Sequence, residues 1–136
     1  MKIAVIDGLG GGLGSQIVAE LKNELTNIEV IALGTNARAT SNMIESGADW
    51  GATGENPIKV NSADMDIIVG PLGIIIPNSM HGEITPVMAE AVADSGARKF
   101  LIGIRQPHVQ IIGMKDVSIN EMIEEVTEKI QSCIEN

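Results

Sequence analysis

Hydrophobic residues follow two alternating patterns along this chain. Short runs rich in Ile, Val and Leu alternate with longer stretches in which apolar positions recur every three or four residues. The first run, residues 2–7, is almost wholly apolar, as expected of a strand covered on both faces. This alternation predicts an α/β fold, a Rossmann-like three-layer sandwich with a mostly parallel sheet of five or six strands.

The pattern assigns approximate bounds to each element. The expected strands are residues 2–7, 28–33, 48–51, 66–70, 99–104 and, after a turn at 106–108, 109–114. The expected helices cover 15–25 and 37–46, and three more begin at the caps Asn56, Thr85 and Ser118. The last helix would carry a core stripe of Ile119, Met122, Ile123, Val126, Ile130 and Ile134, and we expect Trp50, Phe100 and Cys133 in the core. No repeat or linker interrupts the pattern, which predicts one domain over residues 1–136.

Composition narrows the class of partner. The formal net charge of −9 argues against a nucleic acid or an anionic membrane surface, because both require clustered Lys and Arg. No apolar run approaches the roughly 18–20 residues that span a bilayer, and the patterned region starts at Met1 with no signal peptide before it. We therefore expect a cytoplasmic protein.

Five glycines between Gly8 and Gly14 follow the first strand and precede the first helix. Gly8, Gly12 and Gly14 fit the G-x-x-x-G-x-G spacing of short-chain dehydrogenases. Glycine there permits positive φ and close approach of backbone N–H groups to an anion, and the helix N-terminus adds partial positive charge. The loop predicts binding of a nucleotide or another phosphorylated small molecule; the alternative is a tight turn that only packs the helix.

Asp7 departs from the dehydrogenase pattern, which has Thr at this point. Its carboxylate would repel a bound phosphate unless a cation or a proton intervenes. Two roles are open: Asp7 caps the N–H groups of the loop, or it holds a hydrated Mg²⁺ against a phosphate.

The end of the second strand carries no acid to hold ribose hydroxyls, as NAD sites usually do. Thr35, Asn36 and Arg38 stand there instead. Their hydroxyl, amide and guanidinium groups suit a 2′-phosphate or another anion, which favours NADP or another nucleotide over NAD. The alternative for Arg38 is a solvated residue in the first turn of a helix.

The stretch after the fourth strand is the other candidate wall of a ligand crevice. His81 is the best general acid or base there, since imidazole titrates near neutral pH. Glu83 is a weaker catalytic candidate, because it also complements a helix dipole. The residues expected to bind the ligand are Asp7, Gly8, Gly10, Gly11, Gly12, Gly14, Ser15, Gln16, Thr35, Asn36, Arg38, Gly70, Pro71, Gly73, Asn78 and Ser79.

Several catalytic signatures are absent from the chain. It contains no Tyr, so the Tyr-x-x-x-Lys pair of short-chain dehydrogenases is missing, and it has neither a Walker-type loop nor Cys-rich metal spacing. The leading hypothesis is a binding or sensory module without catalysis. A small enzyme that acts on a nucleotide or phosphorylated metabolite through His81, and a structural subunit, are the alternatives.

The apolar run 72–76 falls in a predicted loop and would need cover. A symmetric homodimer would provide it.

Four segments, "IDGLGGGLG", "IALGTNARAT", "GATGENPI" and "GPLGIIIPNSMHGEITP", together resemble an uncharacterised family of small bacterial proteins found in clostridial-type organisms. The resemblance covers nearly the whole chain. It implies a stand-alone Rossmann-like domain of the bacterial cytoplasm, and it carries no activity or catalytic residues over to this chain.

Overall fold

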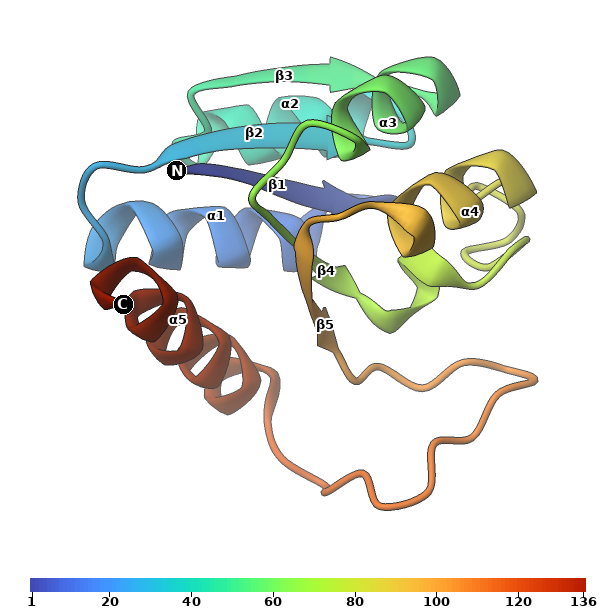
Figure 1. Cartoon of the computed structure of the whole chain (residues 1–136). Helices are drawn as coiled ribbons and strands as arrows, with labels where there is room; N and C mark the ends of the chain where they lie inside the picture. Colours follow the sequence, from blue (N-terminus) through green and yellow to red (C-terminus); the bar gives the residue numbers. More distant parts are fainter.

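A computed structural model describes all 136 residues (Figure 1). Strands and helices alternate along the chain, as the hydrophobic pattern predicts. The elements are β1 (Lys2–Asp7), α1 (Gly12–Glu24), β2 (Glu29–Gly34), α2 (Ala37–Glu45), β3 (Trp50–Thr53), α3 (Glu55–Ser62), β4 (Ile67–Pro71), the 3-10 helix η1 (Leu72–Ile75), α4 (Pro86–Asp94), β5 (Arg98–Ile102) and α5 (Ile119–Glu135).

The five strands form one parallel sheet in the order β3-β2-β1-β4-β5. The chain runs outward from β1 to β3 and then crosses back to β4, so β1 and β4 flank the point where the strand order reverses. This is the order of a Rossmann-like domain. The expected fold class is confirmed, but residues 109–114 form no sixth strand.

Side chains of β1 alternate between the two faces of the sheet. Ile3 and Val5 join a cluster with α1, α2 and α5, while Ala4 and Ile6 join a second cluster with α3, η1 and α4. Figure 1 shows α1 and α5 on one side of the sheet and α4 on the other. The helices therefore cover both faces, and the strands are apolar throughout for that reason.

Three of the helix starts have side-chain caps. The Oγ atoms of Thr85 and Ser118 accept the N–H groups of Met88 and Glu121, and the Asn36 side chain accepts the N–H of Ala39. The expected cap at Asn56 is wrong, because α3 starts at Glu55 after Gly54, whose φ of 105° favours glycine.

Five expectations about burial need correction. Trp50 lies on the edge strand β3 with 39% of its surface exposed, and its indole N–H donates to Glu29. Ile119 opens α5 and is 41% exposed. Cys133 and Phe100 are half-buried rather than enclosed. The run 72–76 is not an exposed loop, because Leu72–Ile75 form η1, which buries Ile74 completely in the domain's own core and leaves Leu72, Ile75 and Ile76 half-buried.

A long segment without helix or strand, residues 103–118, joins β5 to α5; we call it the arm. It projects from the body of the domain (Figure 1, orange). Its regular pairing is limited to one isolated bridge between Gln106 and Val109. Among the helices, none combines the length and the apolar composition needed to cross a membrane.

Candidate functional site

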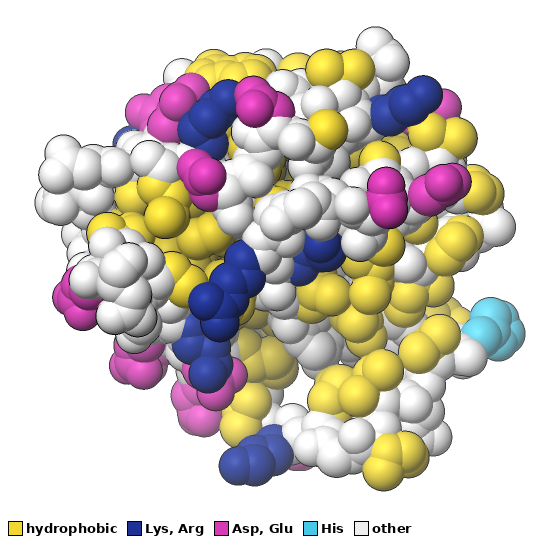
Figure 2. Space-filling view, in the orientation of Figure 1, with side chains coloured by type: hydrophobic (Ala, Val, Ile, Leu, Met, Phe, Trp, Pro, Cys, Tyr) yellow, Lys and Arg dark blue, Asp and Glu magenta, His cyan; other side chains and the backbone are white.

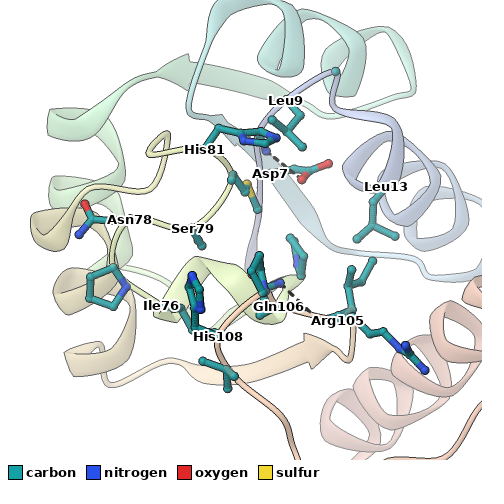
Figure 3. Close-up of a pocket in the computed structure, with 18 of the residues that line it drawn as sticks. Asp7, Leu9, Leu13, Ile76, Asn78, Ser79, His81, Arg105, Gln106 and His108 are labelled. Carbon is teal, nitrogen blue, oxygen red and sulfur yellow. Dashed lines mark hydrogen bonds between the residues drawn. The ribbon is translucent and has the colours of Figure 1, made fainter.

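A cavity of about 640 Å³ opens at the carboxyl edge of the sheet, where the strand order reverses (Figure 3). Three loops form its walls, one each from the ends of β1, β4 and β5. Figure 3 shows Asp7, Leu9 and His81 on one side and Gln106 and His108 on the other. The lining residues are Asp7 to Leu13, Pro71, Ile76 to His81 and Ile104 to Val109.

Asp7, the last residue of β1, is 5% exposed, and its carboxylate accepts hydrogen bonds from the glycine loop. Its Oδ1 accepts the Gly8 N–H at 2.8 Å, and its Oδ2 accepts the Gly14 N–H, in the first turn of α1, at 2.7 Å. Burial raises the pKa of Asp7, and these two hydrogen bonds oppose the rise. The carboxylate therefore caps the helix from inside, which is the first of the two roles open from the sequence.

Three of the five glycines are required by the fold. A Cβ at Gly8 would lie 2.6 Å from Thr35 Oγ1, and one at Gly14 would lie 2.6 Å from Met43 Sδ. Gly11 has a φ of 73° and would place a Cβ 2.7 Å from the Ala39 backbone. These positions have glycine because α1, α2 and the loop pack closely.

Gly10 and Gly12 differ from these three. Neither has a positive φ, and a Cβ built on either meets no atom within 4 Å. Both line the cavity. Gly12 is moreover the first residue of α1, where alanine would favour the helix more. Neither backbone conformation nor packing in the fold accounts for glycine at these two positions.

The hydrogen-bond partners of the loop divide its N–H groups into two sets. Asp7 accepts those of Gly8 and Gly14, Glu83 accepts that of Leu9, and backbone carbonyls accept those of Gly11 and Ser15. The N–H groups of Gly10, Gly12 and Leu13 have no partner in the protein. The free donors thus include the first two residues of α1, at the positive end of the helix dipole.

Glu83 joins the glycine loop to the end of β2. Its Oε1 accepts the Leu9 N–H at 2.9 Å, the Thr35 hydroxyl at 2.5 Å and the Asn36 amide at 2.8 Å. Partial burial acts to raise the pKa of Glu83, but these three hydrogen bonds and the nearby His81 outweigh it and hold the pKa below its ordinary value. Thr35 and Asn36 are therefore engaged by a carboxylate of the protein itself.

The glycine loop is also held from α2. Asn36 Nδ2 donates to the Leu9 carbonyl at 2.9 Å, and Asn42 Nδ2 donates to the Gly10 carbonyl at 2.7 Å. With Asp7 and Glu83, these bonds fix the loop on both sides of its free N–H groups. The loop is preformed.

The wall from β4 contains a cluster of left-handed backbone conformations. Asn78, Met80 and His81 have φ values of 65°, 55° and 56°, and Gly82 follows at 91°. Such conformations are uncommon for residues other than glycine, and they concentrate at functional sites. The Ser79 hydroxyl donates to the Gly73 carbonyl at 2.5 Å, which anchors the segment and leaves His81 exposed at the cavity.

Charge at the cavity differs from charge over the whole chain. Asp7 is the one acidic residue of the lining, against Arg105, His81 and His108. The Arg105 side chain points away from the glycine loop in Figure 3. No group of three or more His, Cys, Asp or Glu side chains is placed to hold a metal ion.

The structure brings together only part of the expected site. The cavity is lined by Asp7, Gly8, Gly10, Gly11, Gly12, Pro71, Asn78, Ser79 and His81. Outside the lining lie Gly14, Ser15, Gln16, Thr35, Asn36, Arg38, Gly70, Gly73 and Glu83. The reason differs among them: Glu83 occupies the donors at the end of β2, Gly14 and Gly73 pack against neighbouring side chains, and Gln16 is exposed on α1.

The arm supplies the part of the wall that sequence reasoning missed. Residues 104–109 line the cavity, although we expected Gln106 and His108 to form only a turn. The position of this segment held the signal, because it follows a strand and the carboxyl ends of parallel strands meet at one edge.

These features define a Rossmann-like α/β domain with a preformed glycine loop beside a cavity at the switch point of its sheet. The chain belongs to the family described as "Domain of unknown function (DUF3842)", whose model matches residues 2–135. No curated protein matches the sequence. Among solved structures, the chain is similar to the crystal structure of a dodecameric FMN-dependent UbiX-like decarboxylase from Escherichia coli O157:H7, with 13% identity, a TM-score of 0.42, and coverage of 100% of this chain and 95% of that chain.

Proposed function

We propose that the chain binds a small phosphorylated molecule in this cavity as a non-catalytic binding or sensory module. The phosphate would lie at the start of α1 and accept the free N–H groups of Gly12 and Leu13. The observation that carries the proposal is the pair Gly10 and Gly12, which face the cavity and are required by neither φ nor packing.

The lining carries few negative groups and several hydrogen-bond donors, which supports an anionic ligand. His81 and His108 both border the cavity, and the single carboxylate of the lining, Asp7, already accepts the N–H groups of Gly8 and Gly14. A ligand phosphate therefore meets free donors and imidazoles in a chain whose net charge is otherwise −9.

The size and shape of the cavity favour a mononucleotide or a phosphorylated metabolite of similar size. A volume of about 640 Å³ lies in the range of small-molecule sites. A dinucleotide such as NADP would place its second ribose beside β2, where Glu83 occupies Thr35 and Asn36. Ile76, Ile104 and Val109 instead offer apolar contact on the side of the cavity away from β2.

Thermal unfolding tests this proposal with pairs of compounds that differ by one phosphate. Nucleoside monophosphates and sugar phosphates are compared with the free nucleosides and sugars at millimolar concentration. We expect at least one phosphorylated member to raise the melting temperature and its partner to leave it unchanged. In Gly12→Val the shift should disappear, whereas Gly96→Val should retain it, because Gly96 also has open space around it but lies outside the cavity.

A result in which no phosphorylated compound shifts the melting temperature contradicts the proposal and favours a structural role for the glycine loop. An equal shift in wild type and Gly12→Val places the ligand elsewhere.

One observation favours an enzyme as the second candidate. His81 holds a left-handed backbone at the cavity wall, a conformation that the fold must enforce. The variant His81→Asn separates the candidates, because Asn tolerates that backbone but cannot exchange a proton near neutral pH. Under the binding proposal this variant still binds the phosphorylated compound through the loop N–H groups and loses only the contact of the His81 imidazole, and no product forms with either protein.

A further inference from the structure

The arm carries an unusual density of exposed apolar side chains. Every residue from 107 to 120 is exposed. Six of the chain's twelve exposed large hydrophobic residues lie in 109–119: Val109, Ile111, Ile112, Met114, Val117 and Ile119. Ile112 is 87% exposed. A contiguous apolar surface of this kind marks a contact with another molecule.

Beyond Val109, the backbone N–H groups of the arm also lack partners. No N–H group from residue 110 to residue 117 donates a hydrogen bond within the protein. The sequence of residues 109–114 nevertheless has the composition of a strand, rich in Val and Ile. The segment has strand-forming residues, but it has no neighbouring strand to pair with.

The body of the domain offers complementary features beside the arm. The strand β5 lies at the edge of the sheet and pairs only with β4, so its outer backbone groups are open to a further strand. The arm itself encloses a hollow of about 690 Å³ against Leu72 of η1, and the apolar part of its lining includes Leu72, Ile104 and Ile111. Figure 2 shows hydrophobic atoms on both sides of this hollow.

The charge around the arm also favours a copy of the same chain. The arm holds two basic residues, Arg105 and Lys115, against one acidic residue, Asp116, and Arg98 and Lys99 stand at the start of the preceding strand β5. The helix α5 that follows holds five Glu and one Lys, and all five Glu are exposed. Two adjacent surfaces of opposite net charge are the arrangement that a two-fold axis can pair with itself.

We propose that the arm is the contact surface for a second copy of this chain. Each arm packs its apolar side chains into the hollow of its partner and lies along the open β5 edge there, with its basic residues opposite the acidic α5 of the partner. The arm, and the hollow and β5 edge that would receive the partner's arm, lie on one surface patch of the chain, as an isologous interface requires.

This contact bears on the ligand cavity, because residues 104–109 form one of the cavity walls and begin the arm. The partner would fix that wall by holding the arm beyond it. The cavity has the same three walls in the single chain, but the wall from the arm is held from outside only in the pair of chains.

Sedimentation velocity of the full chain across micromolar concentrations tests the proposal without any ligand. We expect wild type to be dimeric and Ile112→Asp to be monomeric, with dimerisation weakened by about 100-fold or more because symmetry buries the substituted residue twice. The folded monomer should tolerate the change, since Ile112 is 87% exposed. Val60→Asp, at a 59% exposed position on α3, is the matched control and should remain dimeric.

Amide hydrogen exchange identifies the surface involved. In wild type, the amides of residues 110–114 should be protected, although they have no partner within one chain, and Ile112→Asp should remove that protection. A monomeric wild type, a dimer that Ile112→Asp leaves intact, or a dimer with unprotected arm amides would each overturn the proposal. Because no ligand is present, these outcomes are independent of the proposed phosphate site.

Discussion

At the scale of single residues, two carboxylates decide which backbone donors of the glycine loop remain available. Asp7 satisfies the N–H groups of Gly8 and Gly14, and Glu83 satisfies that of Leu9. Their environments differ: burial raises the pKa of Asp7, whereas hydrogen bonds from Thr35, Leu9 and Asn36 lower that of Glu83. The stability that Asp7 contributes should therefore fall as the pH rises, whereas the stability that Glu83 contributes should fall as the pH falls.

The raised pKa of Asp7 predicts a specific pH dependence of stability. A group with a raised folded pKa contributes stability below its unfolded value, here 3.8, and loses it as the pH rises through the folded value. We expect the free energy of unfolding of wild type, relative to Asp7→Asn, to fall as the pH rises from below 3.8 towards neutrality. Urea unfolding at a series of pH values measures this difference, and a constant difference would show that Asp7 is not perturbed.

Glu83→Gln tests the second carboxylate. Gln keeps an acceptor for Leu9 and Thr35 but loses the charge, so we expect a loss of about 1 kcal/mol in the free energy of unfolding at neutral pH. The lowered pKa gives the loss its pH window: the stability that Glu83 contributes is present above its unfolded value of 4.5 and is lost as the pH falls through the folded value. The exposed Glu90→Gln on α4 is the control, and an equal effect in both variants would contradict the account.

At the scale of elements, hydrophobic periodicity and helix caps predicted all five strands, and the start of each of the five helices, to within a few residues. It succeeded because every strand except the two at the sheet edges is covered on both faces and every helix packs one face on the sheet. It failed at residues 109–114, where a strand-like sequence has no neighbouring strand to pair with. Pairing is a property of the assembled sheet, and composition alone does not reveal it.

The sequence located the glycine loop, but it did not show which of its glycines serve packing and which face the cavity. The spacing of Gly8, Gly12 and Gly14 treats the glycines as equivalent, whereas Gly8 and Gly14 serve packing and Gly12 faces the cavity. Likewise, Thr35 and Asn36 were assigned to a ligand because Glu83, more than forty residues away, was not known to reach them. Long-range side-chain contacts of this kind require the structure.

The first turn of α1 yields a prediction that separates stability from binding. Gly12→Ala adds a methyl group in open space on a helical residue, and it should raise the free energy of unfolding by a few tenths to about 1 kcal/mol. The same methyl group should weaken binding of the phosphorylated compound, because it stands between the ligand and the free N–H groups. Urea unfolding and calorimetric titration measure the two effects, and a variant that is less stable would show that the fold requires Gly12.

At the scale of the whole molecule, the domain places a cavity with mostly basic titratable groups inside an acidic chain, and builds one of its walls from an arm that the domain does not cover. Loops after β1 and β4 are held by hydrogen bonds within the domain, while in the arm after β5 no N–H group of residues 110–117 donates a hydrogen bond. The ligand site and the proposed contact between copies thus meet at residues 104–109.

The central claim, that a phosphate binds the free donors at the start of α1, is tested most directly by titrating the ¹⁵N-labelled protein with millimolar phosphate and nucleoside monophosphates. The account predicts that the largest changes in amide chemical shift occur at Gly10, Gly12 and Leu13, whose N–H groups have no partner in the protein, with smaller changes at Gly8, Leu9 and Gly14. Changes confined to other surfaces, or none in the glycine loop, would contradict it.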